Sequence, residues 1–193
     1  MLAPLSVSVP VPAKTSEPPV LPLALPRQPT AQSEMMALTG VPLCAHPLEQ
    51  EYIDGTYRYR GVTRVCGMAQ RIGRALMRYQ PVKINEALVP GASLPFWGGL
   101  KVLHLPGHTE GHCGFYSQRF DLLFCGDLFA SYSIGARLPP VFFNSCPEKL
   151  GGSLRTVQHL APRHLIPNHA DRLDGELHRR RFDDLLSKWG HLV

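Results

Sequence analysis

The sequence predicts an α/β fold, because short apolar runs alternate along the chain with segments of helical periodicity. The apolar runs at 100–105, 120–124 and 165–166 each stop shortly before a proline or glycine, which is typical of buried strands. Hydrophobic residues make up 44% of the 193 residues, which is enough for one globular domain with its own core.

The expected elements follow one another from residue 34 onward. Gly40 stops the first helix, and Pro81 ends the longest one because proline cannot continue a helix. Helices are expected at 34–38, 47–53, 62–79, 147–160 and 175–189, and strands at 41–45, 100–105, 113–117, 121–125 and 164–166.

Residues 1–33 differ in composition from the rest of the chain, because they are rich in proline and poor in charge. Proline removes a backbone donor and blocks helices and central strands, so this segment is expected to be a disordered tail. The chain is therefore expected to divide into a Pro-rich disordered tail at 1–33 and one domain at 34–193.

Three polar residues follow the apolar runs: His108, Asp127 and His169. Side chains placed just beyond strand ends lie on loops held by a rigid sheet, where residues that do chemistry are often found. If these loops converge, two His and one Asp suit zinc or another borderline transition metal, with positions left open for water. Any one of them alone is more often a loop cap or a satisfied polar residue.

The motifs around these residues occur in a recognisable order. Pro-Gly-His-Thr-Glu-Gly-His at 106–112 precedes Gly-Asp-Leu-Phe at 126–129 and Asn-His at 168–169. Their order and spacing resemble the metallo-β-lactamase-fold hydrolases, and among them the glyoxalase II-like thioester and ester hydrolases. Residues 39–49 resemble the helix end and strand that follow the first metal motif in such enzymes.

The sequence also departs from that family, because no His-x-His pair occurs anywhere in it. The family's HxHxDH motif supplies two His to one metal and an Asp-His pair to the other. The resemblance implies that His108 completes the first metal, Asp127 bridges both, and His169 completes the second. It therefore implies one or two zinc ions, held by half of the usual ligands, and a partial αββα sandwich with the N-terminal strands missing.

The activity implied by the resemblance is hydrolysis of an ester, thioester or amide by metal-bound hydroxide, with Asp127 as the catalytic residue. Without the first motif, weak or no turnover is expected, so whether this chain acts as an enzyme is left open. The alternative is a non-catalytic remnant that binds or complements another chain through apolar surface left uncovered. The expected partners are accordingly a small-molecule substrate and an oligomer or complementing chain.

Three neighbouring residues are also candidates for the site. His112 is interpreted as a supporting residue that fixes a loop or a ligand, in preference to direct ligation. His46 is expected to cap a strand end, although it is a possible substitute for a missing ligand. The thiol of Cys125, in an apolar strand, is expected to be packing and not a ligand.

Charge and cysteine content limit the other classes of function. The formal net charge is +5, with basic residues gathered at 71–78 and 179–181. These are interpreted as solvated helix faces, and no specific nucleic-acid partner is expected because no nucleic-acid-binding module accompanies them. No apolar run reaches the length of a membrane span, so no membrane partner is expected either. The five cysteines form no CxxC pair, which favours reduced thiols in the cytoplasm.

Overall fold

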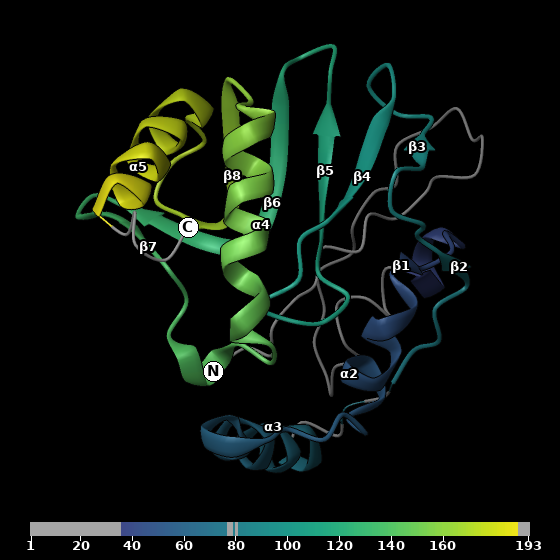
Figure 1. Cartoon of the computed structure of the whole chain (residues 1–193). Coiled ribbons are helices and arrows are strands. Elements are labelled where there is room, and N and C mark those ends of the chain that lie inside the picture. Colours follow the sequence, from purple (N-terminus) through teal and green to yellow (C-terminus); the bar gives the residue numbers. More distant parts are fainter. Residues whose placement is uncertain (1–35, 77–78, 80, 189–193) are drawn as a thin grey trace.

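The computed structural model describes residues 36–76, 79 and 81–188. The expected tail at 1–33 and the last residue of the closing helix, Trp189, lie outside this range. In the described part, helices alternate along the chain with strands that form a mixed sheet (Figure 1), so the α/β class predicted from the sequence is confirmed.

The described elements follow the expected order and add several short ones. In chain order they are β1 Cys44–Ala45, η1 Pro47–Glu49, α2 Gln50–Asp54, η2 Gly61–Thr63, α3 Arg64–Leu76, β2 Glu86–Ala87, β3 Ser93–Leu94, β4 Leu100–His104, β5 Cys113–Ser117, β6 Leu122–Tyr132, β7 Gly135–Arg137, η3 Val141–Phe143, α4 Pro147–Leu160, β8 His164–Ala170 and α5 Gly175–Lys188. Strand β1 falls within the strand expected at 41–45, whereas β2, β3 and β7 were not predicted because such short segments carry no periodic signal.

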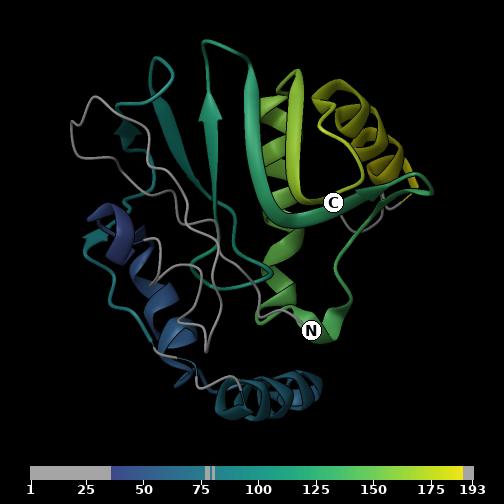
Figure 2. The same ribbon diagram turned by 180° about the vertical axis from the view of Figure 1, so that it is seen from behind.

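The main sheet is built around β6. Its hydrogen-bonded order is β3-β4-β5-β6-β7, and β8 pairs with β6 in parallel while the other pairs are antiparallel. A separate two-stranded sheet joins β1 to β2. Figures 1 and 2 show α4 and α5 on one face of the main sheet, and α3 lying apart from it.

Strand β6 is longer than the sequence predicted. The expected strand ended at Cys125 because Gly126 was interpreted as a terminator, whereas the observed strand continues to Tyr132. Gly126 has a φ of +58° and lies where the pairing register with β8 shifts, so it forms an irregularity within the strand and bends it (Figure 2). Asp127 therefore lies within a strand, and its expected position on a loop is wrong.

Strand β8 is also longer than predicted. It was expected to end at Ile166 because Pro167 follows, but it runs to Ala170 and includes His169. Pro167 pairs with Gly126 at the register shift, where the ladder is already irregular, so the missing donor is tolerated. His169 is thus held at the end of a strand beside the bent part of β6.

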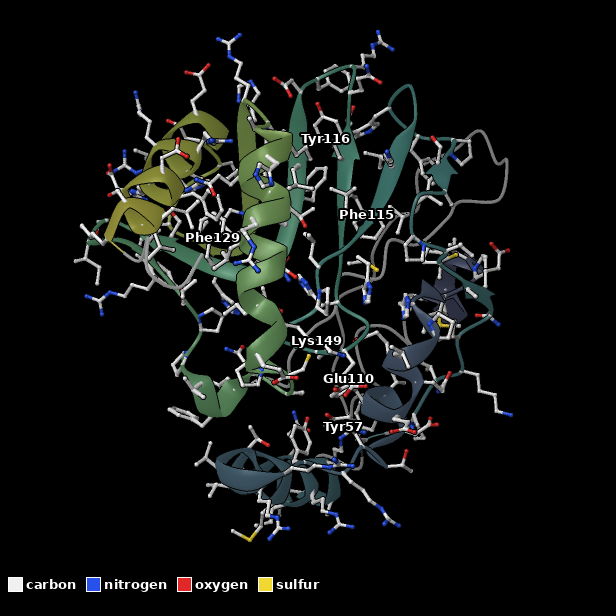
Figure 3. The ribbon with its side chains drawn as sticks, in the orientation of Figure 1. Tyr57, Glu110, Phe115, Tyr116, Phe129 and Lys149 are labelled. Atoms are coloured by element: carbon white, nitrogen blue, oxygen red, sulfur yellow. The ribbon has the colours of Figure 1, made fainter. Side chains whose placement is uncertain are left out.

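Two apolar clusters stabilise the sheet. The larger cluster includes Phe129 of β6 and Phe182 of α5, and it fixes α4 and α5 on the sheet. The second cluster includes Val102 and Phe115 of the neighbouring strands β4 and β5. In Figure 3, Phe129 lies beside α4 and α5 and Phe115 lies on β5, so the two clusters occupy different parts of the sheet.

Candidate metal centre

The structure brings His108, Asp127 and His169 together, although they come from three elements. His108 lies on the loop between β4 and β5, Asp127 lies just after the irregularity in β6, and His169 lies near the end of β8. The parallel pairing of β6 with β8 places His169 opposite Ala130, close to the Asp127 carboxylate. Sheet topology therefore explains how residues far apart in the sequence meet.

The two imidazoles face different oxygens of the same carboxylate. His108 Nε2 is 3.9 Å from Asp127 Oδ2, and His169 Nε2 is 3.4 Å from Asp127 Oδ1. Two ligands on one tetrahedral zinc lie about 3.3 Å apart, given metal–ligand distances of about 2.0 Å. The shorter separation is close to that of two side chains that share a cation, and the Asp127 carboxylate lies between the two imidazoles.

His108 is oriented by Asn144, which directly follows η3. His108 Nδ1 lies 3.3 Å from Asn144 Oδ1, so Nδ1 carries the proton and donates it to the amide oxygen. The lone pair then resides on Nε2, which points toward Asp127. A hydrogen bond from the second ring nitrogen of a ligating His commonly fixes the tautomer in this way.

Two atoms at the centre of the site lack hydrogen-bond partners among the described residues. They are His108 Nε2 and Asp127 Oδ1, and both are buried. An unsatisfied buried polar atom costs about 1–3 kcal/mol, so native structures rarely retain one without a function or a bound group. An imidazole nitrogen and a carboxylate oxygen are both ligand types that suit a transition metal.

His112 supports the site from behind and is itself fully buried. Its Nδ1 donates to the carbonyl of Leu105 at 2.8 Å, and its Nε2 accepts the backbone N–H of Asp127 at 3.0 Å. Burial lowers the pKa of His112 from 6.5 to about 4, so the ring is neutral at pH 7. Because both ring nitrogens are engaged, this geometry favours the supporting role over direct ligation.

Gly126 allows His112 to approach the backbone of β6. A Cβ at this position would collide with Nε2 of His112, and the positive φ is unfavourable for other residues. The glycine that sequence analysis interpreted as a strand end is therefore needed for contact between β6 and His112, which lies in the loop just before β5.

The loop that carries His108 is fixed by contacts from both ends of the domain. The backbone N–H of Ser145 donates to the carbonyl of His108 at 2.8 Å, and Ser153 of α4 donates its hydroxyl to Pro106 at 2.6 Å. On the other side, buried Glu49 accepts the backbone N–H of Gly111 at 3.0 Å. These contacts hold the loop before any ligand binds.

Sequence reasoning missed Glu49 and Asn144 as supporting residues. Glu49 is 62 positions from the glycine that it binds, and Asn144 is 36 positions from His108. Neither residue lies in a motif with a spacing that signals a site. Tyr57 was missed for the same reason: it lies on the loop after α2, beside Glu110, below the His108 loop (Figure 3).

The ligand set is incomplete in the described part of the chain. Within that part, no group of three or more His, Cys, Asp or Glu side chains has the arrangement needed to hold a metal ion. Each imidazole meets Asp127 at a different oxygen, so each metal position receives two side chains. A catalytic zinc normally takes three protein ligands. The residues thus fit a metal in donor type, while their number is too small.

The other histidine and cysteine candidates have structural roles. His46 accepts the backbone N–H of Leu48 as the N-cap of η1, and its ring stacks on His104 at 4.7 Å between centroids. The expected cap is therefore confirmed, although it begins a 3₁₀ helix. Cys125 is fully buried in the larger apolar cluster, which agrees with the packing interpretation.

The basic patch at 179–181 is largely neutralised. Arg179 pairs with Asp183 at 2.8 Å, and Arg181 pairs with Asp171 at 2.9 Å. Arg74, in the other basic segment, donates to the backbone carbonyls of Tyr52 and Ile53. Arg74 therefore packs against the chain, so its expected place on a solvated helix face is wrong.

Comparison with known proteins identifies the family. The model of the metallo-beta-lactamase superfamily matches residues 35–169, which is more than half of the chain. The hydroxyacylglutathione hydrolase of Synechococcus sp. (strain JA-2-3B'a(2-13)) is 38% identical over 74 residues, covering 38% of this chain and 27% of the hydrolase. The enzyme of the same name from Aeromonas hydrophila is 36% identical over 72 residues, covering 36% of this chain and 26% of the enzyme. The alignments thus span about a quarter of these curated relatives.

Solved structures show the same fold. The metallo-beta-lactamase superfamily protein ST1585 from Sulfolobus tokodaii has a TM-score of 0.56 at 16% identity, covering 81% of this chain and 61% of that protein. TTHA1623, solved in a di-iron-bound form, has a TM-score of 0.55 at 25% identity, covering 77% of this chain and 67% of that protein.

Proposed function

The chain belongs to the metallo-beta-lactamase superfamily, and from this premise we propose that it supplies half of a metal-dependent site for hydrolysing a thioester or ester. The observation that carries the proposal is the pair of buried, unsatisfied atoms, His108 Nε2 and Asp127 Oδ1. The similarity to hydroxyacylglutathione hydrolases supports a thioester over an amide.

The proposed roles follow from the contacts of each side chain. Asp127 would hold a bound metal ion through its carboxylate, and His108 would offer the lone pair on Nε2 because Asn144 retains the proton on Nδ1. His169, with 67% of its side chain exposed, lies where substrate and solvent can reach the centre. When bound, zinc or a similar ion supplies a Lewis acid that polarises the substrate carbonyl and acidifies water.

His112 contributes by holding a proton in a fixed place. It keeps hydrogen on Nδ1 for the Leu105 carbonyl and accepts the N–H of Asp127 at Nε2, so it fixes the backbone that carries the carboxylate. Its low pKa keeps the ring neutral, which avoids a positive charge beside the cation site. We assign His112 a positioning role and no direct contact with substrate.

The second candidate function is a non-catalytic binding or complementing module. It is favoured by the incomplete ligand set among the described residues, since two side chains per metal position do not make a stable zinc site. On this account no metal would bind, and the chain would act through apolar surface that the absent strands leave uncovered.

Metal analysis of the purified full chain distinguishes the two candidates. After dialysis against a small excess of zinc, the proposed hydrolase half-site retains zinc that Asp127→Ala loses. Asp184→Ala, which removes an exposed carboxylate from α5, is the matched control and retains wild-type zinc. Equal zinc in wild type and Asp127→Ala would contradict a metal site at these residues.

Hydrolysis of a hydroxyacylglutathione thioester tests the reaction itself. Turnover by this chain is expected to be weak, to depend on added zinc, and to disappear in Asp127→Ala. Turnover that persists in Asp127→Ala would show that the activity arises elsewhere. Absence of both zinc binding and turnover would favour the non-catalytic module.

A further inference from the structure

Helix α3 packs against the rest of the chain with its polar side. Tyr59 donates to the side chain of Gln70 at 2.8 Å, and Arg74 donates to the Ile53 carbonyl at 2.7 Å. Gly67, on the same side, lies directly against the ring of Tyr59. Positions 67, 70 and 74 therefore form the inner face of this helix.

The apolar side of α3 consequently points away from the protein. Val65, Met68, Ile72 and Leu76 follow one another at helical spacing, and all are exposed, Ile72 by 56% and Leu76 by 80%. Val62 of η2 extends this outward face at its N-terminal end. We call these five residues the α3 face. A surface helix of a soluble domain normally presents the opposite orientation, with its apolar stripe toward the core.

Element η3, which contacts both η2 and α3, adds to the apolar surface beside the helix. Its three residues, Val141, Phe142 and Phe143, are all exposed. Contiguous exposed apolar patches commonly mark interaction sites. Their exposure makes the η3 residues available to a partner.

The charge of α3 indicates what kind of partner fits. The helix contains three arginines and no acidic residue. A cavity of about 780 Å³ between residues 55–59 and α3 is lined by Arg58, Arg64 and Arg71 together with Met68, and no carboxylate lines it. None of the ion pairs found in the described part of the chain includes Arg58, Arg64 or Arg71.

A cationic surface bordering an outward apolar face matches an anionic lipid surface. In-plane amphipathic helices bury their apolar side chains among acyl chains, and flanking arginines reach the phosphate groups. A second copy of this chain fits less well, because pairing two such helices would bring arginines together without carboxylates. We infer that the α3 face docks this protein on an anionic phospholipid bilayer.

The α3 face would lie on the surface of the bilayer and would not cross it. No helix among the described residues is long and apolar enough to cross a membrane. The expectation of no membrane partner was drawn from the absence of a spanning segment, and a 13-residue helix lying in the interface escapes that criterion.

Vesicle sedimentation of the full chain tests the inference. The chain is expected to sediment with vesicles of equal parts phosphatidylcholine and phosphatidylglycerol, less with phosphatidylcholine alone, and less as salt increases. Ile72→Glu is expected to weaken binding about tenfold or more, since it places a charge in the apolar layer. Leu173→Glu, at a residue 91% exposed outside the α3 face, is the matched control and should bind like wild type.

A charge pair provides the second arm. Arg71→Glu is expected to weaken binding to the anionic vesicles about fivefold or more, whereas Arg155→Glu on α4 makes the same change in net charge with little effect. Circular dichroism verifies that each variant is folded. Equal binding to both kinds of vesicle, or equal losses in Ile72→Glu and Leu173→Glu, would overturn the inference. Self-association that Ile72→Glu abolishes, without vesicle binding, would overturn it in favour of a second copy.

Discussion

His108 and His169 flank the same carboxylate in contrasting surroundings. The side chain of His108 is 11% exposed, and its ring is oriented by Asn144. The side chain of His169 is 67% exposed at the end of a strand. The fold thus orients the His108 ring, whereas His169 is placed by its backbone and its ring is open to solvent.

The supports behind the two histidines differ in the same way. The loop that carries His108 is held by hydrogen bonds to Ser153 of α4 and to Glu49, a few residues from His108. Near His169 the contacts fix the backbone: His178 of α5 binds Ser131 at 2.8 Å, and Asp171 donates its N–H to the Ser131 carbonyl at 3.1 Å. Preorganisation of a metal ligand requires a hydrogen bond to its second ring nitrogen, and of these two histidines only His108 shows one among the described residues.

The largest expected effect comes from removing the support shared by both positions. His112→Ala leaves a cavity and two unsatisfied backbone groups, at Leu105 and Asp127, so it is expected to lower the free energy of unfolding by about 3–5 kcal/mol. Urea denaturation measures this change. A loss below about 1 kcal/mol would show that the buried ring does not anchor the site.

The pH dependence of stability tests the same residue without mutation. Because the pKa of His112 is lowered to about 4 in the folded chain, its contribution is fully present above pH 6.5 and is lost as pH falls toward 4. The expected loss is about 3 kcal/mol, because protonating the buried ring is disfavoured relative to the unfolded chain. Urea denaturation at a series of pH values measures it, and His112→Gln should flatten this part of the profile.

The orientation of His108 is tested by Asn144→Ala. Loss of the amide oxygen frees the His108 ring, so zinc affinity is expected to fall about tenfold or more. Gln118→Ala removes an exposed amide elsewhere and is the matched control. Competition with a zinc chelator measures the affinities. Unchanged affinity in Asn144→Ala would remove the distinction drawn between the two histidines.

The smallest expected effect lies outside the site. His46→Ala removes an N-cap and a ring stacked on His104, so the free energy of unfolding should fall by about 1 kcal/mol. Zinc content should stay the same, because His46 is not among the proposed ligands. His159→Ala, on the exposed side of α4, controls for loss of an imidazole. A drop in zinc with His46→Ala would extend the ligand set.

The sequence by itself determined the α/β class, the order of the main elements and the three residues that meet at the centre. Apolar runs and helical periodicity are local signals, so strand β5 and helix α4 occur at their predicted residues. The family likeness of the motifs at His108, Asp127 and His169 was likewise visible in short segments.

The tertiary structure decided what local signals do not contain. Gly126 and Pro167 were interpreted as strand ends, and only the pairing of β6 with β8 shows both at one irregularity inside continuous strands. The roles of Asn144 and Glu49 depend on contacts across 36 and 62 positions. The outward orientation of α3 was equally hidden, because periodicity reveals an apolar face but not which way it points.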